Sequence, residues 1–369
     1  MTTRALARID VGAIERNCAQ LASVAAPAKL CAVVKADGYG HGAVPAARAA
    51  RAGGAEWLAV AAAAEAHALR DAGLGGPILV MGALSPEELD IALAAGADVV
   101  AWREGFVAEL ARRAGTARVG VHVKLDTGMG RLGTRDAGEA TRVADAVLAA
   151  PALELVGAMT HFATADEEDR SFLEQQLRAF DPWAADLSAR RPGLLVHAAN
   201  SAATLAVPAA RFDLVRCGIA IYGMDPFHRD PGAHGLLPAL ELRSYVADVK
   251  RCRAGESAGY GRRFVAERDT WLGVLPIGYG DGVRRALTNN ADVIVGDRRV
   301  PLVGTVSMDN VTVDLGPGGH VAPGTDAVLI GAGILAEDVA KRLGTINYEV
   351  TCGISARVPR HYHRDGAPA

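Results

Sequence analysis

About the first two thirds of the chain alternate short apolar runs with longer segments in which apolar residues recur three and four positions apart. Short uninterrupted apolar runs are typical of buried strands, and the longer period is typical of helices packed on them. The predicted strands are 30–36, 57–62, 77–82, 98–102, 119–126, 153–161, 195–199 and 213–217. The predicted helices are 43–53, 63–72, 86–95, 104–114, 137–149, 169–189 and 202–206. This alternation predicts an α/β fold with a parallel (β/α)8 TIM barrel over residues 10–235.

Two local signals bear on the barrel prediction. Ser85, Pro86 and the two glutamates after them are typical of a helix start, because serine caps free amides and proline suits the first helical position. The alternative fold is an open doubly wound sheet, which a G-x-G-x-x-G fingerprint after the first strand would favour. Gly38, Gly40 and Gly42 follow that strand with a different spacing, so the barrel is the preferred interpretation.

The pattern changes after about residue 235, where short β-like runs are separated by Gly, Pro, Asp and Asn. The predicted strands are 242–250, 270–276, 291–296, 299–305, 310–315 and 326–331, and only 336–343 is predicted as helix. Frequent turn residues between short strands favour antiparallel pairing. We therefore predict a second, mostly antiparallel β domain over 236–369, with about residues 1–9 as a candidate strand of it.

Composition and charge narrow the class of protein. The net charge of −3 gives no electrostatic reason to expect nucleic acid or an anionic membrane as a partner. The five cysteines are scattered without a C-x-x-C pair, which favours neither a disulfide framework nor a metal site. The N-terminal residues lack the apolar core of a secretory signal, and no apolar stretch reaches membrane-spanning length. We expect a soluble cytoplasmic enzyme.

Lys35 is the first candidate for chemistry, because it ends the apolar run that forms the first predicted strand. An ammonium group in such a place is paired, has a shifted pKa or is used covalently. The three glycines after it allow a tight turn and close approach of the backbone to a ligand. Strand, lysine and glycine-rich turn together predict a Schiff-base site.

Other polar residues follow the same strand ends, which are the edge where barrel enzymes place their chemistry. Lys124 lies in the fifth strand with Arg131 just beyond it, His161 ends the sixth, Asn200 and Ser201 follow the seventh, and Arg216 and Gly218 end the eighth. The sequence therefore predicts one active site at this rim.

Motifs along nearly the whole chain resemble those of the alanine racemase family, which are fold-type III pyridoxal-phosphate enzymes with a barrel and a C-terminal β domain. The matching segments are Ala32–Gly42, Lys124–Gly133, Thr160–Asp166, His197–Ser201, Val215–Ile219, Tyr260–Gly261, Ile277–Arg285, Ser307–Asp309 and Arg357–Arg360. The resemblance implies pyridoxal 5′-phosphate as cofactor, alanine as substrate and a homodimer with shared active sites.

The resemblance gives four residues a defined role. Lys35 would carry the cofactor and act as one base, and Tyr260 from the other subunit would act as the opposing acid or base. Arg216 would face the pyridine nitrogen, where a permanent positive charge disfavours protonation. His161 would bind the cofactor by stacking on its ring, or would form a hydrogen bond near Tyr260 and Arg216. Without the resemblance each residue has a structural alternative. Lys35 would form an ion pair at the end of a strand, and Tyr260 would be an aromatic residue in a turn. Arg216 would pair with a carboxylate.

The remaining positions follow from the same resemblance. Cofactor contacts are implied for Tyr39, Arg131, Asn200, Ser201, Gly218, Ile219 and Tyr348. Substrate contacts are implied for Arg131, Tyr279, Met308 and Asp309, and the access corridor for Asp166 and Arg285. Lys124 is often carbamylated in the family, and the alternative is a pair with an acid such as Asp126.

We therefore predict two-base racemisation of L- and D-alanine that supplies D-alanine for peptidoglycan. The alternatives are a broader amino-acid racemase, a fold-related decarboxylase or a non-catalytic carrier of the cofactor. Such decarboxylases usually carry a Cys-Glu-Ser-Gly segment that this chain lacks, and the carriers resemble the barrel alone.

Overall fold

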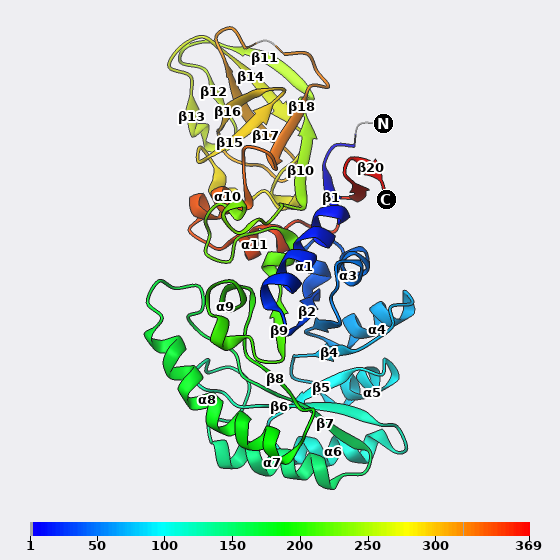
Figure 1. The fold of residues 1–369 in the computed structure, drawn as a ribbon. Coiled ribbons are helices and arrows are strands. Elements are labelled where there is room, and N and C mark those ends of the chain that lie inside the picture. The colour runs from blue at the N-terminus through cyan, green and yellow to red at the C-terminus, as the bar shows by residue number, and fades with distance from the viewer. Residues whose placement is uncertain (1–2, 320) are drawn as a thin grey trace. The chain divides into compact units, whose positions relative to one another are not determined.

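The structure is a computed structural model that describes residues 3–319 and 321–369 (Figure 1). The chain divides into two compact units. The barrel unit contains residues 14–227 and 232–236, and the β unit contains the N-terminal residues up to Ala13, residues 228–231 and residues 237–369. Residues 1 and 2, part of the candidate strand at about 1–9, lie outside the described residues.

In the described part of the barrel unit, eight parallel strands run in the order β8-β7-β6-β5-β4-β3-β2-β9. Their bounds are β2 (Lys29–Val33), β3 (Trp57–Val60), β4 (Ile78–Val80), β5 (Asp98–Ala101), β6 (Val119–Lys124), β7 (Leu153–Met159), β8 (Leu195–His197) and β9 (Leu214–Cys217). The amides of Asp213 and Arg216 donate to the carbonyls of Val196 and Ala199 at 3.0 and 2.9 Å, which links β9 back to β8. The predicted (β/α)8 barrel is confirmed.

The helices that connect the strands are α3 (Ala43–Ala52), α4 (Ala63–Asp71), α5 (Pro86–Ala94), α6 (Glu104–Ala114), α7 (Ala137–Ala149), α8 (Ser171–Arg190) and α9 (Ser201–Ala206). The predicted start of α5 is confirmed: the Glu88 amide donates to Ser85 Oγ at 3.2 Å, and the Ser85 amide donates to Glu88 Oε2 at 2.8 Å. Helix α1 (Val11–Ala25), which precedes β2, is absent from the sequence prediction.

Seven of the eight barrel strands end one to three residues earlier than the sequence predicts, which moves two candidate residues out of their strands. Strand β2 ends at Val33 and β7 ends at Met159, so Lys35 and His161 lie in the segments after the strands and do not end them. The reason at Lys35 is visible in the next residue, whose backbone turns left-handed and whose amide donates to Glu65 and not to a neighbouring strand.

The described residues of the β unit form a mostly antiparallel sheet in the order β11-β14-β17-β16-β15-β18-β10-β1-β19-β20. Its strands are β1 (Leu6–Asp10), β10 (Leu240–Tyr245), β11 (Asp248–Cys252), β14 (Thr270–Leu275), β15 (Ala291–Val295), β16 (Arg298–Val303), β17 (Val311–Gly316), β18 (Asp326–Ile330), β19 (Arg360–Arg364) and β20 (Ala367–Pro368). Strands β12 (Ser257–Ala258) and β13 (Phe264–Val265) form a separate pair. The helices are α10 (Ala336–Leu343) and α11 (Asn347–Cys352).

The single strand predicted at 242–250 is wrong, because it is two strands, β10 and β11. The chain changes partners between them: β10 pairs with β1 and β18, whereas β11 pairs with β14. Strand β1 pairs with β10 and also with β19, so the N-terminal strand belongs to this sheet.

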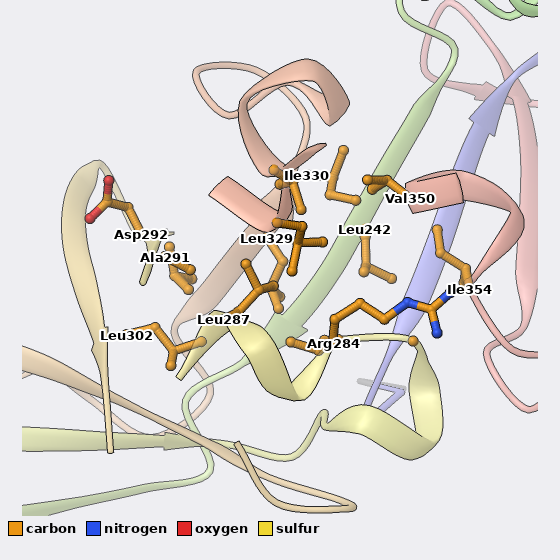
Figure 2. A pocket seen from close by; sticks show the side chains of 15 residues that line it. Leu242, Arg284, Leu287, Ala291, Asp292, Leu302, Leu329, Ile330, Val350 and Ile354 are labelled. Carbon is orange, nitrogen blue, oxygen red and sulfur yellow. The ribbon is translucent and has the colours of Figure 1, made fainter. Parts of the chain in front are cut away.

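The β unit also contains an apolar hollow of about 40 Å³ between the sheet and its two helices. Figure 2 shows Leu242, Leu287, Leu329 and Ile330 around it, with Arg284 at one side. No helix within residues 3–319 or 321–369 combines the length and apolar character needed to cross a bilayer.

Candidate active site

The turn that carries Lys35 has an unusual backbone. Segment α2 (Lys35–Tyr39) begins two residues after β2, and Ala36, Asp37 and Tyr39 have φ of 52°, 51° and 54°. A left-handed conformation costs about 1–2 kcal/mol for each residue with a Cβ. Such strain persists only where the surroundings hold it, and it is concentrated at functional sites. The partly buried Lys35 is therefore fixed on a backbone that the protein maintains at a cost.

Two hydrogen bonds between side chains and backbone amides hold the first half of the turn. The Ala36 amide donates to Glu65 Oε1 on α4 at 2.6 Å. The Asp37 carboxylate accepts the Ala43 amide at the start of α3 at 3.0 Å. These bonds connect the two residues after Lys35 to α4 and α3, which limits where the lysine can lie.

Tyr39, Ser201 and Gly218 come together on the rim. The Ser201 hydroxyl accepts the amides of Gly218 at 3.0 Å and Ala220 at 3.3 Å, which leaves its own O–H to donate elsewhere. A Cβ at Gly218 would lie 2.3 Å from the Tyr39 hydroxyl oxygen, so only glycine fits. Ile219 begins the 3₁₀ turn that follows. Hydroxyls and turn amides of this kind suit a phosphate group.

Asn200, for which the resemblance implies a cofactor contact, lies at the start of the helix that follows β8. It is the N-cap of α9, and its Oδ1 accepts the Ala203 amide at 3.0 Å. Ser201 is therefore the first helical residue, and its side chain is available to the β9 turn.

Arg216 on β9 is buried and is held by four acceptors. Its guanidinium contacts His197 Nδ1 at 2.8 Å, the Thr160 carbonyl at 2.8 Å, the Ala198 carbonyl at 3.1 Å and His161 Nδ1 at 3.2 Å. Burial lowers the pKa of Arg216 to about 10, so it stays charged at neutral pH. A guanidinium only donates, so both histidine nitrogens that face it must be acceptors.

A buried chain of polar groups continues from Arg216. His197 Nε2 lies 2.8 Å from His122 Nδ1, and His122 Nε2 lies 3.4 Å from Asp98 Oδ2. Because Arg216 donates to His197, a neutral His197 donates to His122, which in turn donates to Asp98. Burial, Arg216 and His122 hold the pKa of His197 well below its usual range, which agrees with this direction.

Lys124 is the last residue of β6 and is buried. Burial lowers its pKa to about 8, and the charges of Arg216 and the exposed Arg131 act in the same direction. The alternative partner, Asp126, accepts the amides of Gly128 and Gly130 at 3.1 and 2.8 Å. Asp126 thus organises the loop that leads to Arg131.

His161 lies two residues beyond β7 and contacts Arg216. Burial comes first among the causes that hold its pKa well below the usual range, followed by the charges of Arg216 and Lys124. Asp166, predicted in the access corridor, is exposed on the loop after His161.

Four predicted site residues of the β unit, Tyr260, Tyr279, Met308 and Asp309, lie in or beside the segment 305–309. Thr305 Oγ1 donates to the Tyr260 carbonyl at 2.6 Å, and the Tyr279 amide donates to the Ser307 carbonyl at 2.9 Å. Met308 and Asp309 follow directly. The side chains of Tyr260, Tyr279 and Met308 are exposed, by 75%, 43% and 52%.

Arg357 contacts this segment, and the predicted residues Arg285 and Tyr348 lie on other elements of the β unit. Arg357 bonds to Asp281 at 2.7 Å and also to the Asp309 carboxylate, so it holds Asp309 in place. Arg285 is exposed in a 3₁₀ turn, and Tyr348 lies on α11.

Four residues that hold the site are missing from the sequence prediction of functional residues. They are Glu65 on α4, Asp98 on β5, His122 on β6 and His197 on β8. A signal existed for His122, because a histidine within the apolar strand Val119–Lys124 needs a partner. Gly157 on β7 makes room for that ring, since a Cβ there would lie 2.2 Å from His122 Nδ1.

Comparison with known proteins agrees with this geometry. Residues 9–226 match the family described as alanine racemase, N-terminal domain, and residues 239–362 match alanine racemase, C-terminal domain. The chain is 45% identical over 375 residues to an alanine racemase of Thermobifida fusca, which covers 98% of this chain and 99% of the relative. It is 40% identical over 368 residues to alanine racemase 1 of Bacillus subtilis, covering 98% and 93%.

Solved structures give the same result. The crystal structure of alanine racemase from Streptomyces lavendulae superposes with a TM-score of 0.93 at 36% identity and covers 98% of both chains. The alanine racemase of Bacillus anthracis with bound L-Ala-P superposes with a TM-score of 0.90 at 36% identity, covering 100% of this chain and 97% of the other. With both family domains matched in order, this chain belongs to the alanine racemase family of isomerases.

Proposed function

We propose that this chain interconverts L- and D-alanine with pyridoxal 5′-phosphate as cofactor. The observation that carries the proposal is the meeting of the Tyr39 and Ser201 hydroxyls at the Gly218 turn, on the rim that also carries Lys35. These groups fit a phosphate, and a lysine amine fits an aldehyde. When bound, the cofactor withdraws electrons from the substrate and makes its Cα proton acidic.

The barrel residues would hold the cofactor at both of its ends. The amides of Gly218 and Ile219 and the hydroxyls of Tyr39 and Ser201 would bind the phosphate. Asn200 would contribute by fixing the start of α9, since it caps that helix. By the family pattern, Tyr348 of the β domain would add a further hydroxyl.

Arg216 would face the ring nitrogen of the cofactor. Its side chain is held by two histidine nitrogens and two carbonyls, so its position is fixed before any ligand binds. A permanent positive charge there keeps the ring nitrogen unprotonated. This limits how far electrons move into the ring and would favour return of the proton to Cα over side reactions.

Lys35 and Tyr260 would be the two bases. Lys35 Nζ would exchange a proton on one face of Cα and Tyr260 Oη on the other, because inversion needs removal and delivery from opposite sides. Tyr260 is 75% exposed in the single chain, which supports a role toward a second copy. We therefore propose a homodimer in which Tyr260 of each chain serves the barrel of the other.

The substrate carboxylate would lie near Arg131, with Tyr279, Met308 and Asp309 lining the substrate end. Lys124, whose pKa of about 8 leaves a reactive fraction of neutral amine near neutral pH, would be carbamylated. The amine nitrogen attacks the carbon of CO₂ and loses a proton, which gives an anion. That anion would orient the Arg131 guanidinium, in place of two cations that repel each other.

We also propose cytoplasmic synthesis of D-alanine for peptidoglycan as the cellular role, with Asp166 and Arg285 lining the access corridor. The support is the match to relatives named alanine racemase along the whole chain.

The test uses protein loaded with pyridoxal phosphate. Borohydride reduction and peptide mapping should find the pyridoxyl group on Lys35, and racemisation of either enantiomer should be seen as loss of optical rotation. In D₂O, Lys35→Ala and Tyr260→Phe should impair deuterium incorporation unequally for L- and D-alanine. Tyr245→Phe, a tyrosine of β10, is the matched control and should behave as wild type. Unimpaired racemisation by Tyr260→Phe in both directions would contradict the two-base mechanism.

A further inference from the structure

His41 is a fully buried histidine that the proposed reaction does not use. Its Nδ1 lies 3.0 Å from the carbonyl oxygen of Gly38 and 3.0 Å from that of Tyr39. Carbonyl oxygens only accept, so Nδ1 must carry a hydrogen that the two oxygens share. Both oxygens belong to the left-handed turn that follows Lys35.

The backbone bonds of the turn depend on its left-handed conformation. The Gly38 amide donates to the Val34 carbonyl at 3.0 Å, and the Gly42 amide donates to the Asp37 carbonyl at 2.8 Å. Residues with a Cβ do not adopt this conformation by preference, so something outside the backbone has to hold it. Glu65 does this for the first half of the turn, and His41 contacts the second half.

The ring of His41 also connects this turn to the β9 turn. It stacks on Tyr222 with ring centres 4.5 Å apart and an angle of 28° between the planes. Tyr222 closes the 3₁₀ turn that begins at Ile219, and its ring lies 5.1 Å from that of Tyr39. Its hydroxyl donates to the Val33 carbonyl at the end of β2 at 3.1 Å.

We propose that His41 is a positioning residue that holds the Lys35–Tyr39 turn in its left-handed form and sets the place of the Lys35 amine and the Tyr39 hydroxyl. The Nδ1–H fixes the two carbonyls, and the ring fixes the turn against Tyr222. The effect of this role on cofactor binding rests on the proposed function. The conformation of the turn is a property of the protein alone.

Two substitutions separate the donor from the ring. His41→Phe keeps a flat ring for Tyr222 but removes the Nδ1–H that the Gly38 and Tyr39 carbonyls share. The Gly38 carbonyl keeps the backbone amide of residue 41, at 3.0 Å. His41→Asn keeps an N–H at nearly the position of Nδ1 but has no ring. Ser244→Ala is the control, because it also removes one buried donor to a carbonyl, that of Arg4 at 2.6 Å, in the β unit.

The first measurement is hydrogen exchange of the Gly38, Gly40 and Gly42 amides in protein without cofactor. His41→Phe should speed their exchange about tenfold, which is the order expected for loss of a buried hydrogen bond, and His41→Asn should stay within about threefold of wild type. The second measurement is the Kd for pyridoxal 5′-phosphate, which should rise about tenfold in His41→Phe and much less in His41→Asn.

Wild-type exchange and affinity in His41→Phe would overturn the proposal, and so would an equal effect of His41→Asn or of Ser244→Ala. If wild-type protein neither bound the cofactor nor racemised alanine, the proposed function would fail. The exchange measurement would still decide the role of His41, because it uses no cofactor.

Discussion

Replacing Gly218 by alanine tests the phosphate site with the smallest possible change. The added Cβ would lie 2.3 Å from the Tyr39 hydroxyl oxygen and 2.9 Å from its Cζ. Ordinary contact distances require the phenol to move by about 1 Å. Tyr39 is buried on a strained turn, so the movement takes its hydroxyl away from the place where we propose that the phosphate binds.

The expected magnitude follows from the bond that is lost. A hydrogen bond to a charged group contributes about 1.5–3 kcal/mol, which corresponds to a rise of about 10- to 100-fold in Kd. The assay compares the Kd of the unloaded protein for pyridoxal 5′-phosphate and for pyridoxal, which lacks the phosphate. Gly218→Ala should weaken binding of the first and leave binding of the second unchanged.

Two further variants make the result specific to this contact. In a Tyr39→Phe background the hydroxyl is already absent, so Gly218→Ala should cost much less there. Gly105→Ala on α6 is the control, because a Cβ at that position meets nothing within 4 Å. If Gly218→Ala kept the wild-type preference for the phosphorylated ligand, Tyr39 and Gly218 would not form the phosphate site and the reasoning would be refuted.

Three other predictions follow from the buried groups. The pKa of Lys124 falls from 10.5 to about 8 on folding, so between these values the unfolded chain binds more protons and the free energy of unfolding should rise with pH. Urea denaturation in CO₂-free buffer should show that Lys124→Met removes this rise and stabilises the protein at pH 7 by about 1–3 kcal/mol. His122→Phe leaves the His197 Nε2–H and the Asp98 carboxylate without their partner and should cost about 1–3 kcal/mol in the same assay. Leu287→Ala should cost about 2–5 kcal/mol, because it enlarges an existing hollow (Figure 2), and an unchanged midpoint would contradict this.

The barrel could be predicted because its signals are local. The helices predicted at 104–114 and 137–149 have the observed bounds of α6 and α7, since the period of apolar residues is itself the helical period. Helix α1 has the same apolar period, and Asp10 Oδ1 accepts the Ala13 amide at its start at 3.1 Å, but the sequence prediction omitted this helix. The break between β10 and β11 had no such signal, because it depends on which distant strand each segment pairs with.

The candidate site also has a part that local signals predict and a part that depends on contacts between distant residues. Its chemical residues could be placed on one rim from strand order alone, as Lys124 and Arg216 show. The left-handed turn after Lys35 could not, because Ala36 and Tyr39 have no local preference for positive φ and are held by Glu65 and His41. Those contacts exist only once the fold has formed.

The hydrogen-bond partners of Arg216, which the sequence could not identify, determine its chemistry. The N–H donors of a buried guanidinium need hydrogen-bond acceptors. The sequence alone left open that a carboxylate is one of these acceptors. Within the described residues, the hydrogen-bond partners of Arg216 are two histidines and two carbonyls, so its charge is not neutralised by direct contact with an anion. That charge helps to hold the pKa of His161 and His197 well below their usual range. A ring nitrogen placed against the same guanidinium would be kept unprotonated for the same reason, whereas a carboxylate partner would have cancelled the effect.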